Sequence, residues 1–295
     1  MRGGAASPFP ARRTTLRFGV VGVTDMARSR DFYRGALGLH VVAGGRATRG
    51  RRRCLLESEG RRLMLEELPG SGANGWVNDD LQLGMRHIGF KVDDTDRWAE
   101  RVRAAGGVFT REPFDAFGGV RIAFFRDPDG AHLELVQNVV HYTDVWSPPL
   151  AAAEAAVPAP RRPRFDHVAL SVTDVGRTLT LYREALGFEV IGRLAQHDAP
   201  RGFRITYVMA GQAILELFSY TAPMRPNPWV AGAEAPGLLR VGVASTHPRR
   251  TLRAMAAAGA IASVQPGPGA HEVAVDGDGT PYEIGRTRAG GTPSG

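Results

Sequence analysis

Cysteine and lysine are almost missing from this sequence of 295 residues. Cys54 is the only cysteine, which excludes an intrachain disulfide and a cysteine-based metal cluster and is typical of a reducing compartment. We therefore expect a cytoplasmic protein. Lys91 is the only lysine, so the formal net charge of +7 comes almost entirely from arginine.

Long apolar segments are also missing. No run approaches the roughly 20 apolar residues that a membrane-spanning helix needs. Residues 1–15 lack the apolar centre of a secretory signal. No motif of a nucleic-acid-binding fold is recognisable. We expect a protein without membrane or nucleic-acid partners, whose 43% hydrophobic content is enough for two cores.

Arginines are concentrated in one short stretch of the chain. The cluster consists of Arg49, Arg51, Arg52 and Arg53, with Arg61 and Arg62 close by. One interpretation is a solvated hairpin surface. The other is a site for an anionic substrate, because guanidinium groups bind carboxylates and phosphates through two parallel hydrogen bonds.

The chain contains an internal repeat. Residues 17–25 and 166–174 are both alternating stretches that end in Thr-Asp, which is typical of a strand followed by the N-cap of a helix. A helical stretch ending at a glycine follows each of them. Fainter copies of the same pattern begin at residues 86–94 and 239–244. The sequence therefore predicts four related modules.

Each module continues with about three short stretches of strand-forming residues separated by glycine-containing turns. The predicted unit is βαβββ and the fold class is α+β. The modules span residues 16–68, 84–140, 164–220 and 237–287. They form two halves, 16–140 and 164–287, joined by an Ala/Pro-rich linker at 141–163, and the tails 1–15 and 288–295 are expected to be disordered.

The second module contains a tight turn followed by a strand. Asp127–Gly130 has the composition of a turn, and in the strand after it Glu134 alternates with leucines. On an earlier strand of the same module, His87 alternates with apolar residues. His167 and Glu216 repeat this arrangement in the third module. Because the apolar faces would pack on the helices, the histidine and glutamate side chains are expected to face away from them.

On these motifs the chain resembles the vicinal oxygen chelate superfamily, which includes glyoxalases, bleomycin-resistance proteins and extradiol dioxygenases. Asp127–Gly130 together with Leu133–Leu135 is its commonest signature, and the second module looks most like glyoxalase I through residues 86–90 and 110–112. The resemblance implies two tandem domains with cupped mixed sheets, in which two modules hold a divalent metal. Each module would supply a His or Gln from its first strand and a Glu from its last.

By position, the resemblance assigns two candidate ligands to each module. They are Phe18 and Glu66 in the first module, His87 and Glu134 in the second, His167 and Glu216 in the third, and Arg240 and Glu283 in the fourth. Phe18 and Arg240 are not metal ligands, so only the two middle modules are complete.

The sequence leaves the pairing of the modules open, and the pairing decides the site. If the middle modules pair, the resemblance implies one metal held by two histidines and two glutamates: His87, Glu134, His167 and Glu216. If neighbouring modules pair, there are two smaller sets: His87 with Glu66 and Glu134, and His167 with Glu216 and Glu283. A chain without metal is the third alternative.

The middle-module ligands define a plausible chemistry. Imidazole and carboxylate suit Ni, Fe, Mn, Co or Zn, and the metal would polarise a substrate with adjacent oxygens as a Lewis acid. Glu134 or Glu216 would transfer a proton, as in a glyoxalase-like lyase or isomerase. His132, on the same face as Glu134, is either a substrate contact or a rim residue. We expect a monomer or homodimer that acts on a small-molecule substrate, which can be anionic.

Two other functions fit the resemblance. An extradiol-type ring-cleaving dioxygenase would use the positions of His167, Arg240 and Glu283. Arg240 breaks this triad unless His271 supplies the missing ligand. A metal-free binding or resistance protein would have an apolar cup, lined by tryptophans of the connecting stretches: Trp76, Trp146 and Trp229.

Overall fold

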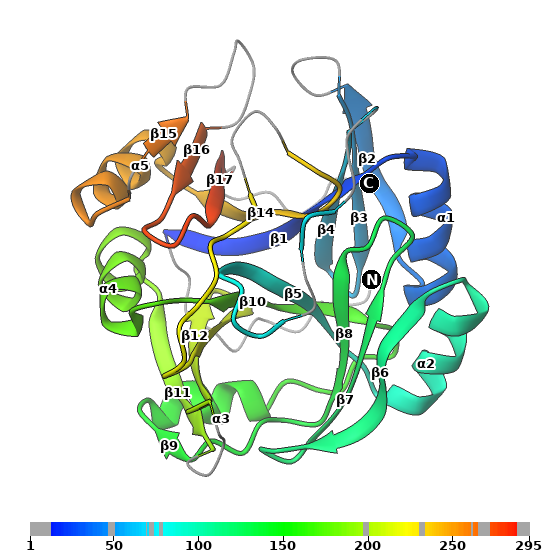
Figure 1. The fold of residues 1–295 in the computed structure, drawn as a ribbon, viewed down its shortest axis with the longest axis horizontal. Coiled ribbons are helices and arrows are strands. Elements are labelled where there is room, and N and C mark those ends of the chain that lie inside the picture. Colours follow the sequence, from blue (N-terminus) through cyan, green and yellow to red (C-terminus); the bar gives the residue numbers. More distant parts are fainter. Residues whose placement is uncertain are drawn as a thin grey trace, which may run out of the picture.

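The computed structural model describes residues 13–46, 51–68, 70, 74–76, 79–196, 201–229, 234–260, 262–264 and 272–287. Within these residues the chain forms two mixed sheets with helices on their flanks (Figure 1). The expected tail at 288–295, most of the tail at 1–15 and His271 lie outside the described residues. Thr14 and Thr15, which the sequence prediction placed in the tail, are the first residues of a strand.

One sheet joins the second and third modules, and we call it the middle sheet. Its strand order is β6-β7-β8-β5-β10-β13-β12-β11-β9. The strands span β5 Gly84–Lys91, β6 Val108–Ala116, β7 Val120–Arg126, β8 His132–Gln137, β9 Asp144–Val145, β10 Arg164–Ser171, β11 Glu189–Ala195, β12 Arg204–Ala210 and β13 Ala213–Ser219. At its centre β5 and β10 are antiparallel, and each is parallel to the last strand of its own module. The first strands of the two middle modules are therefore direct neighbours.

The other sheet joins the first and fourth modules, and we call it the outer sheet. Its strand order is β15-β16-β17-β14-β1-β4-β3-β2. The strands span β1 Thr14–Val23, β2 His40–Arg46, β3 Arg52–Ser58, β4 Arg61–Glu67, β14 Gly237–Ser245, β15 Ala262–Val264, β16 Glu272–Val275 and β17 Pro281–Arg286. Each sheet thus contains one module from each half of the sequence. Strand pairing within both sheets therefore joins the half before the linker to the half after it.

The helices cover the flanks of the sheets. They are α1 Met26–Leu37, α2 Thr95–Ala104, α3 Pro148–Ala155, α4 Val175–Thr180 with the π-helix η2 Leu181–Ala185, and α5 Pro248–Ala257. In Figure 1, α1 and α2 lie together on one side, and α4 and α5 on the other. Apolar strand residues such as Ile88 and Val168 share one core with the helix residues Tyr33 and Trp98. The opposite strand faces are left free to form the site.

The signature turn at Asp127–Gly130 fastens the second module to the first. One carboxylate oxygen of the buried Asp127 accepts backbone hydrogen bonds within the turn, and the other accepts the Tyr33 hydroxyl at 2.8 Å. Asp129 accepts hydrogen bonds from the backbone N–H of Thr24, at 3.0 Å, and from the hydroxyl of Ser29, at 2.8 Å. The conspicuous carboxylates of this motif are therefore structural, and the turn orients the strand that carries Glu134.

The linker is more ordered than its composition predicted. It contains the short strand β9 and the helix α3, whereas we expected no regular structure. Pro148 and Pro149 are the first residues of α3, where a missing N–H removes no helical hydrogen bond. Leu150 of α3 is buried in an apolar cluster that includes Ile191.

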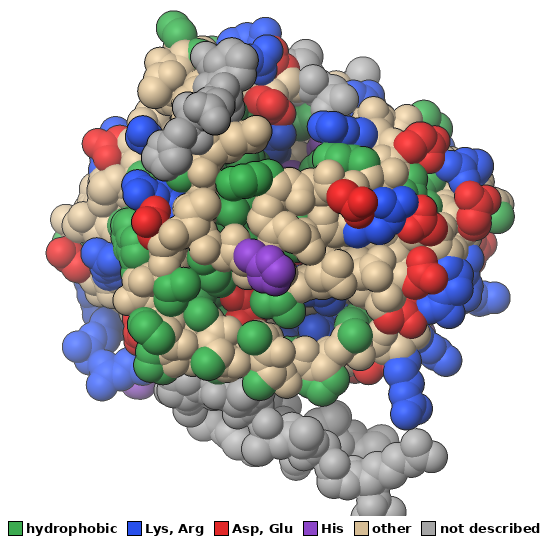
Figure 2. All heavy atoms as spheres, turned by 90° about the horizontal axis from the view of Figure 1, so that it is seen from below, with side chains coloured by type: hydrophobic (Ala, Val, Ile, Leu, Met, Phe, Trp, Pro, Cys, Tyr) green, Lys and Arg blue, Asp and Glu red, His purple; other side chains and the backbone are tan. Residues whose placement is uncertain are grey.

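The surface balances its arginines with nearby acids. On the face in Figure 2, basic and acidic side chains are interspersed near the edges, and hydrophobic side chains are scattered among uncharged surface in the middle and lower part. Arg121, for example, contacts both Asp96 and Asp115. No helix in the described part of the chain is long and apolar enough to cross a membrane.

Candidate metal centre

The middle sheet brings two histidines and two glutamates into one cluster. In one row across the strands, Glu134, Gly89 and His167 are neighbours. In the adjacent row, Glu216, Ala169 and His87 are neighbours. The rows run in opposite directions because β5 and β10 are antiparallel. Each row places a small residue between its glutamate and its histidine, which leaves space between the four side chains.

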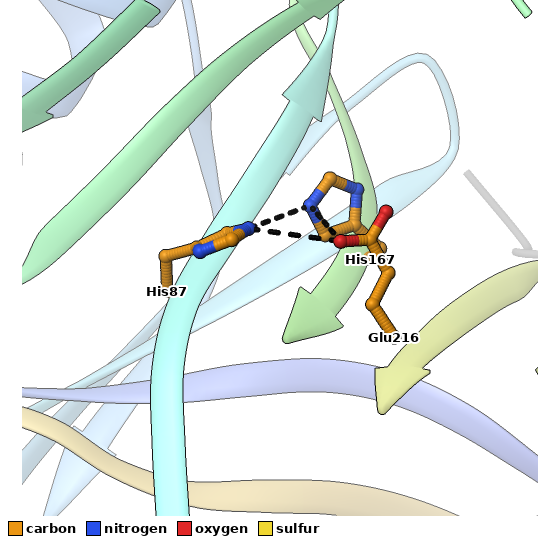
Figure 3. Close-up of side chains that lie close together, drawn as sticks. All are labelled: His87, His167 and Glu216. Atoms are coloured by element: carbon orange, nitrogen blue, oxygen red, sulfur yellow. Dashed lines mark hydrogen bonds and ion pairs between the residues drawn. The ribbon is translucent and has the colours of Figure 1, made fainter. Parts of the chain in front are cut away.

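The four side chains are almost completely buried and point toward one another. The Nε2 atoms of His87 and His167 are 3.2 Å apart. Glu134 Oε2 lies 2.9 Å from His167 Nε2 and 3.3 Å from His87 Nε2. Glu216 Oε2 lies farther away, at 3.7 Å and 3.9 Å from the same two atoms. Figure 3 shows His87, His167 and Glu216 converging from β5, β10 and β13.

Gly89 makes room for one of the histidines. A Cβ atom at this position would lie 2.0 Å from Cε1 of the His167 ring, a distance at which the ring would have to move. The outer sheet has the same arrangement, since a Cβ on Gly242 would lie 2.2 Å from Cε2 of Phe18. The two glycines therefore have equivalent roles, although only one of them faces a possible ligand.

Asp166 is a residue of the candidate site that the sequence interpretation missed. It sits at a break in the pairing of β10 with β5, since Phe165 and His167 have successive partners and Asp166 has none. Such bulges often redirect a side chain beside a functional site. Asp166 Oδ2 lies 3.2 Å from Nδ1 of His167, the nitrogen that faces away from the cluster. The Asp-His pair at the start of the strand was the available signal, because carboxylates often orient metal-binding histidines.

Burial sets the protonation of two members of the cluster. It lowers the pKa of His87 to about 4 and raises the pKa of Glu216 to about 7. The nearby Glu134 carboxylate adds to the rise at Glu216, while His167 opposes it. His87 is therefore a neutral imidazole at neutral pH, ready to donate a lone pair.

The other two members stabilise each other as ions. Burial disfavours the charged form of His167, but the carboxylates of Glu216, Asp166 and Glu134 outweigh it and raise the pKa of His167 well above its usual value. Burial would also raise the pKa of Glu134, but the two histidines lower it to about 2. Without a metal, a protonated His167 compensates the buried carboxylates.

The cluster fits a divalent first-row metal. Adjacent ligand atoms that are each about 2.1 Å from one ion lie about 3 Å apart. The distances among His87, His167 and Glu134 are close to this value. Two carboxylates would neutralise a dication, and imidazole with carboxylate is the ligand chemistry of Fe, Ni, Co, Mn and Zn sites.

The outer-sheet residues that the resemblance assigned as ligands, other than Phe18, form an ion-pair network. By strand register, Met64 and not Glu66 is the equivalent of Glu216. Arg240 contacts Glu66 through Nη2, and its Nε lies 3.5 Å from Glu283 Oε2. Arg53 donates to both Glu283 oxygens, at 2.6 Å and 3.0 Å. Arg51 donates to Glu66 at 2.9 Å. The outer glutamates therefore bind guanidinium groups.

Three arginines of the cluster noted in the sequence form ion pairs in the outer sheet. Arg51 and Arg53 neutralise buried glutamates of the outer sheet, and Arg52 pairs with Glu67 at 2.6 Å. The solvated-hairpin interpretation holds for Arg52, whose side chain is 60% exposed, but not for Arg53, which is 10% exposed. Arg49 lies outside the described residues.

The two neighbour-paired ligand sets do not form. Glu66 and Glu283 belong to the outer sheet, whereas both histidines belong to the middle sheet. The extradiol triad is divided in the same way, because His167 lies in one sheet and Arg240 and Glu283 lie in the other.

A cavity of about 690 Å³ opens beside the four-residue cluster, and we call it the metal cavity. Its wall includes His87, Glu134 and Glu216, and much of the rest is aromatic: Phe114, Phe117, Phe124, Phe203, Tyr207, Phe218 and Tyr220. Three guanidinium groups also line it, those of Arg86, Arg111 and Arg201. Trp76, Trp146 and Trp229, which could line an apolar cup or serve as packing residues, lie outside this wall, and Trp76 packs on His132.

His132 lines the metal cavity as a neutral ring. It is stacked between Trp76 and Phe124, with ring centres 4.8 Å and 5.2 Å away. Burial lowers its pKa to about 3, and the charges of nearby basic groups add to this effect. Its Nε2 lies 3.0 Å from the hydroxyl of Thr110. The ring is therefore a fixed part of the cavity wall.

Paired βαβββ modules with converging histidines and glutamates are the architecture of a glyoxalase-like protein. The model of the Glyoxalase/Bleomycin resistance protein/Dioxygenase superfamily matches residues 16–135 and 164–274, and the chain belongs to this superfamily.

Curated relatives include lactoylglutathione lyases. One from Arabidopsis thaliana is 31% identical over 135 residues, which covers 45% of this chain and 39% of the relative. One from Escherichia coli O157:H7 is 32% identical over 128 residues, covering 42% of this chain and 90% of the relative. The match thus spans about two fifths of the plant protein and nearly all of the bacterial one.

A solved structure shows the same fold over nearly the whole chain. Glyoxalase I from Zea mays superposes with a TM-score of 0.68 at 21% identity, covering 92% of each chain. This agreement covers all four modules and both sheets.

Proposed function

We propose that this chain is a divalent-metal-dependent lyase or isomerase of the glyoxalase type, with its metal held by two histidines and two glutamates: His87, Glu134, His167 and Glu216. The observation that carries the proposal is the convergence of these buried side chains beside an open cavity. The equivalent positions of the outer sheet are filled by Phe18 and by the ion pairs of Arg240, so the proposal has one metal per chain.

The two glutamates have different roles in this proposal. A bound divalent ion would act as a Lewis acid on a substrate with adjacent oxygens. Glu134 is held between His87 and His167 and would stay in place. Both glutamates line the cavity, but Glu216 makes the longer contacts with the histidines. We therefore assign it the proton transfer: its carboxylate takes a proton from one substrate carbon and returns it to the adjacent carbon.

The cavity wall supports a substrate with an apolar part and an anionic part. The aromatic rings would exclude water from the reacting carbons. The guanidinium groups of Arg86, Arg111 and Arg201 could bind carboxylates on the substrate. Since the relatives are lactoylglutathione lyases, the adduct of glutathione with methylglyoxal is the first substrate to test.

Metal content tests the ligand set. We expect about one metal ion per chain after reconstitution, and loss of this ion in His87→Ala, His167→Ala and Glu134→Gln. The matched control is Glu283→Gln, which changes the outer counterpart of Glu134 and should keep the metal. Two ions per chain, or loss of the metal in the control, would contradict the assignment. A wild-type chain that binds no metal would be a binding protein instead.

Solvent exchange tests the reaction. The carboxyl proton of Glu216 can exchange with solvent before it is returned, so an isomerisation in heavy water should place some deuterium on the product carbon. Glu216→Gln should lower kcat by about 100-fold or more. Glu66→Gln, which changes a buried glutamate on the last strand of the first module, should leave kcat unchanged. Oxygen consumption with a catechol substrate would show a dioxygenase and overturn the proposal.

A further inference from the structure

Tyr207 lies beside Glu216 in the middle sheet. The two residues are direct partners across the β12–β13 ladder, and both line the metal cavity. Partners in an antiparallel ladder carry their side chains on the same face of the sheet, with Cβ atoms about 4.5–5.5 Å apart. The phenol ring of Tyr207 therefore shares the sheet face that carries the Glu216 carboxylate.

The other half of the middle sheet has no hydroxyl at this position. By strand register, Phe124 is the partner of Glu134 as Tyr207 is the partner of Glu216. The Phe124 ring packs on His87, with ring centres 5.3 Å apart. At this pair of equivalent positions the two halves differ by one hydroxyl group. That hydroxyl is carried by the neighbour of Glu216, the glutamate to which the proton transfer was assigned.

The Tyr207 hydroxyl is unpaired within the described part of the chain. The residue is only 3% exposed, yet no hydrogen bond joins its hydroxyl to any residue in the described ranges. Other buried tyrosine hydroxyls are paired, since Tyr33 donates to Asp127 and Tyr182 contacts Tyr282. Buried polar groups normally have a hydrogen-bond partner. The Tyr207 hydroxyl is therefore available to a molecule in the metal cavity.

The linker fixes the position of the Tyr207 ring. The ring of Tyr142 stands nearly perpendicular to it, at 74°, with ring centres 5.1 Å apart. Tyr142 is itself held by Glu154 of α3, which accepts its hydroxyl. It also packs against the apolar cluster that contains Tyr207 and Ile191. A donor that is fixed in advance stabilises developing charge more effectively than a mobile one.

The hydroxyl stays protonated at neutral pH. Burial raises the pKa of Tyr207 well above its usual value, and the charges of Glu216 and Glu134 raise it further. A neutral phenol donates a hydrogen bond through its O–H group. Tyr207 is therefore a hydrogen-bond donor, and the neighbouring carboxylates are left to act as bases.

We propose that Tyr207 is a catalytic residue that donates a hydrogen bond to the substrate oxygen that gains negative charge while Glu216 removes the proton. This inference rests on the function proposed above. When Glu216 takes the proton from carbon, the C–H electron pair moves toward the adjacent carbonyl and charge builds up on its oxygen. A hydrogen bond to that oxygen stabilises the charge. The phenol keeps its own proton, and Glu216 returns the other proton to the adjacent carbon.

The kinetic test compares Tyr207→Phe with Tyr182→Phe, a control that removes a buried tyrosine hydroxyl outside the metal cavity. The substrate is the adduct of glutathione with methylglyoxal. Tyr207→Phe should keep about one metal ion per chain, lower kcat by about 100-fold and change KM by less than about threefold, because the hydrogen bond strengthens only as charge develops. Tyr182→Phe should have the kcat of the wild type. An unchanged kcat in Tyr207→Phe would overturn the inference.

A calorimetric titration with acetohydroxamate tests the hydrogen bond without turnover. The anion of this compound presents two adjacent oxygens that share a negative charge, as the charged substrate does. Tyr207→Phe should bind it about tenfold more weakly than the wild type, because a hydrogen bond to a charged group is lost. Tyr182→Phe should bind it as the wild type does. Equal affinities of Tyr207→Phe and the wild type would contradict the assignment.

The outcomes separate this inference from the proposed function. If Glu216→Gln loses activity and Tyr207→Phe does not, the proposed function stands and Tyr207 has no catalytic role. A wild-type chain that binds no metal overturns both, and elemental analysis shows this before any titration. Loss of the metal in Tyr207→Phe would show that the side chain supports the metal cluster, and would overturn the catalytic role alone.

Discussion

Arg240 lies beside Val20 in the outer sheet as His87 lies beside Ala169 in the middle sheet, and the Arg240 guanidinium contacts the outer glutamates Glu66 and Glu283. The Arg240 guanidinium thus neutralises glutamates in the outer sheet, as the divalent metal ion is proposed to do in the middle sheet. Most residues of the proposed site have a counterpart in the outer sheet, so most tests have an internal control.

Replacing Arg240 by Met should destabilise the chain without changing its metal content. The change leaves Glu66 and Glu283 short of a buried cation, and breaking a buried pair typically costs about 3–5 kcal/mol. Urea unfolding measures this loss. Arg97→Met, which removes an exposed pair with Asp93, should cost less than about 1 kcal/mol. Loss of metal in Arg240→Met would show that the outer sheet contributes to the site.

Gly89→Ala should abolish metal binding. The new methyl group would displace the His167 ring, since the position of its carbon lies 2.0 Å from Cε1. Overpacking of this kind costs about 1–3 kcal/mol of stability. Gly242→Ala crowds Phe18 in the same way and should be destabilised similarly while keeping its metal. Metal analysis beside thermal unfolding of both variants distinguishes ligand displacement from general destabilisation.

Asp166→Asn should weaken metal binding without removing a ligand. Carboxylates that orient a metal-binding histidine typically contribute about 10–100-fold to affinity. Competition with a chelator measures the change. The variant should still bind one ion at saturation. Arg17→Gln alters the equivalent break in the outer sheet, where β1 pairs with β14, and should leave the affinity unchanged. Equal affinities of Asp166→Asn and the wild type would show that Asp166 does not support the site.

Metal affinity should rise with pH through neutrality. Burial raises the pKa of Glu216 to about 7, and nearby carboxylates raise the pKa of His167 well above its usual value despite burial. Both groups carry protons in the metal-free chain below pH 7 and must release them to bind a metal. We expect a tenfold loss of affinity per pH unit for each proton released, about two protons at pH 6. Calorimetry in buffers of different ionisation enthalpy counts these protons, and a flat affinity between about pH 6 and pH 8 would contradict the assignment.

The repeat and the alternation of apolar residues were sufficient to predict the modules and their strands. The strand predicted after the turn at Asp127–Gly130 is β8, and the strand predicted at residues 166–174 is β10. Strands and turns of this kind are set by residues that are close together in the sequence. The choice of partner module did not follow from the sequence, because it depends on contacts between β5 and β10, which are about 80 residues apart.

The four residues of the candidate site were predictable from the sequence, whereas the residues that support them were less so. His87, Glu134, His167 and Glu216 were identified by face and position, whereas the bulge at Asp166 and the ring contact at Gly89 depend on the register between modules. The arginines at 51–53 show the same limit. Arg51 and Arg52 pair with Glu66 and Glu67 of their own module, whereas the Glu283 partner of Arg53 is identified only when the fourth module is placed beside the first.

Each sheet combines a module from one half of the chain with a module from the other, and this pairing has a consequence for symmetry. In a dimer of identical two-module chains, the rotation axis makes the two metal sites the same, so a change that disables one disables both. Here the two sheets belong to a single chain, and a substitution falls in one sheet only. The residues at the equivalent positions of His87 and Arg240 can therefore differ. The middle sheet can carry a reactive site while the outer sheet only supports the fold.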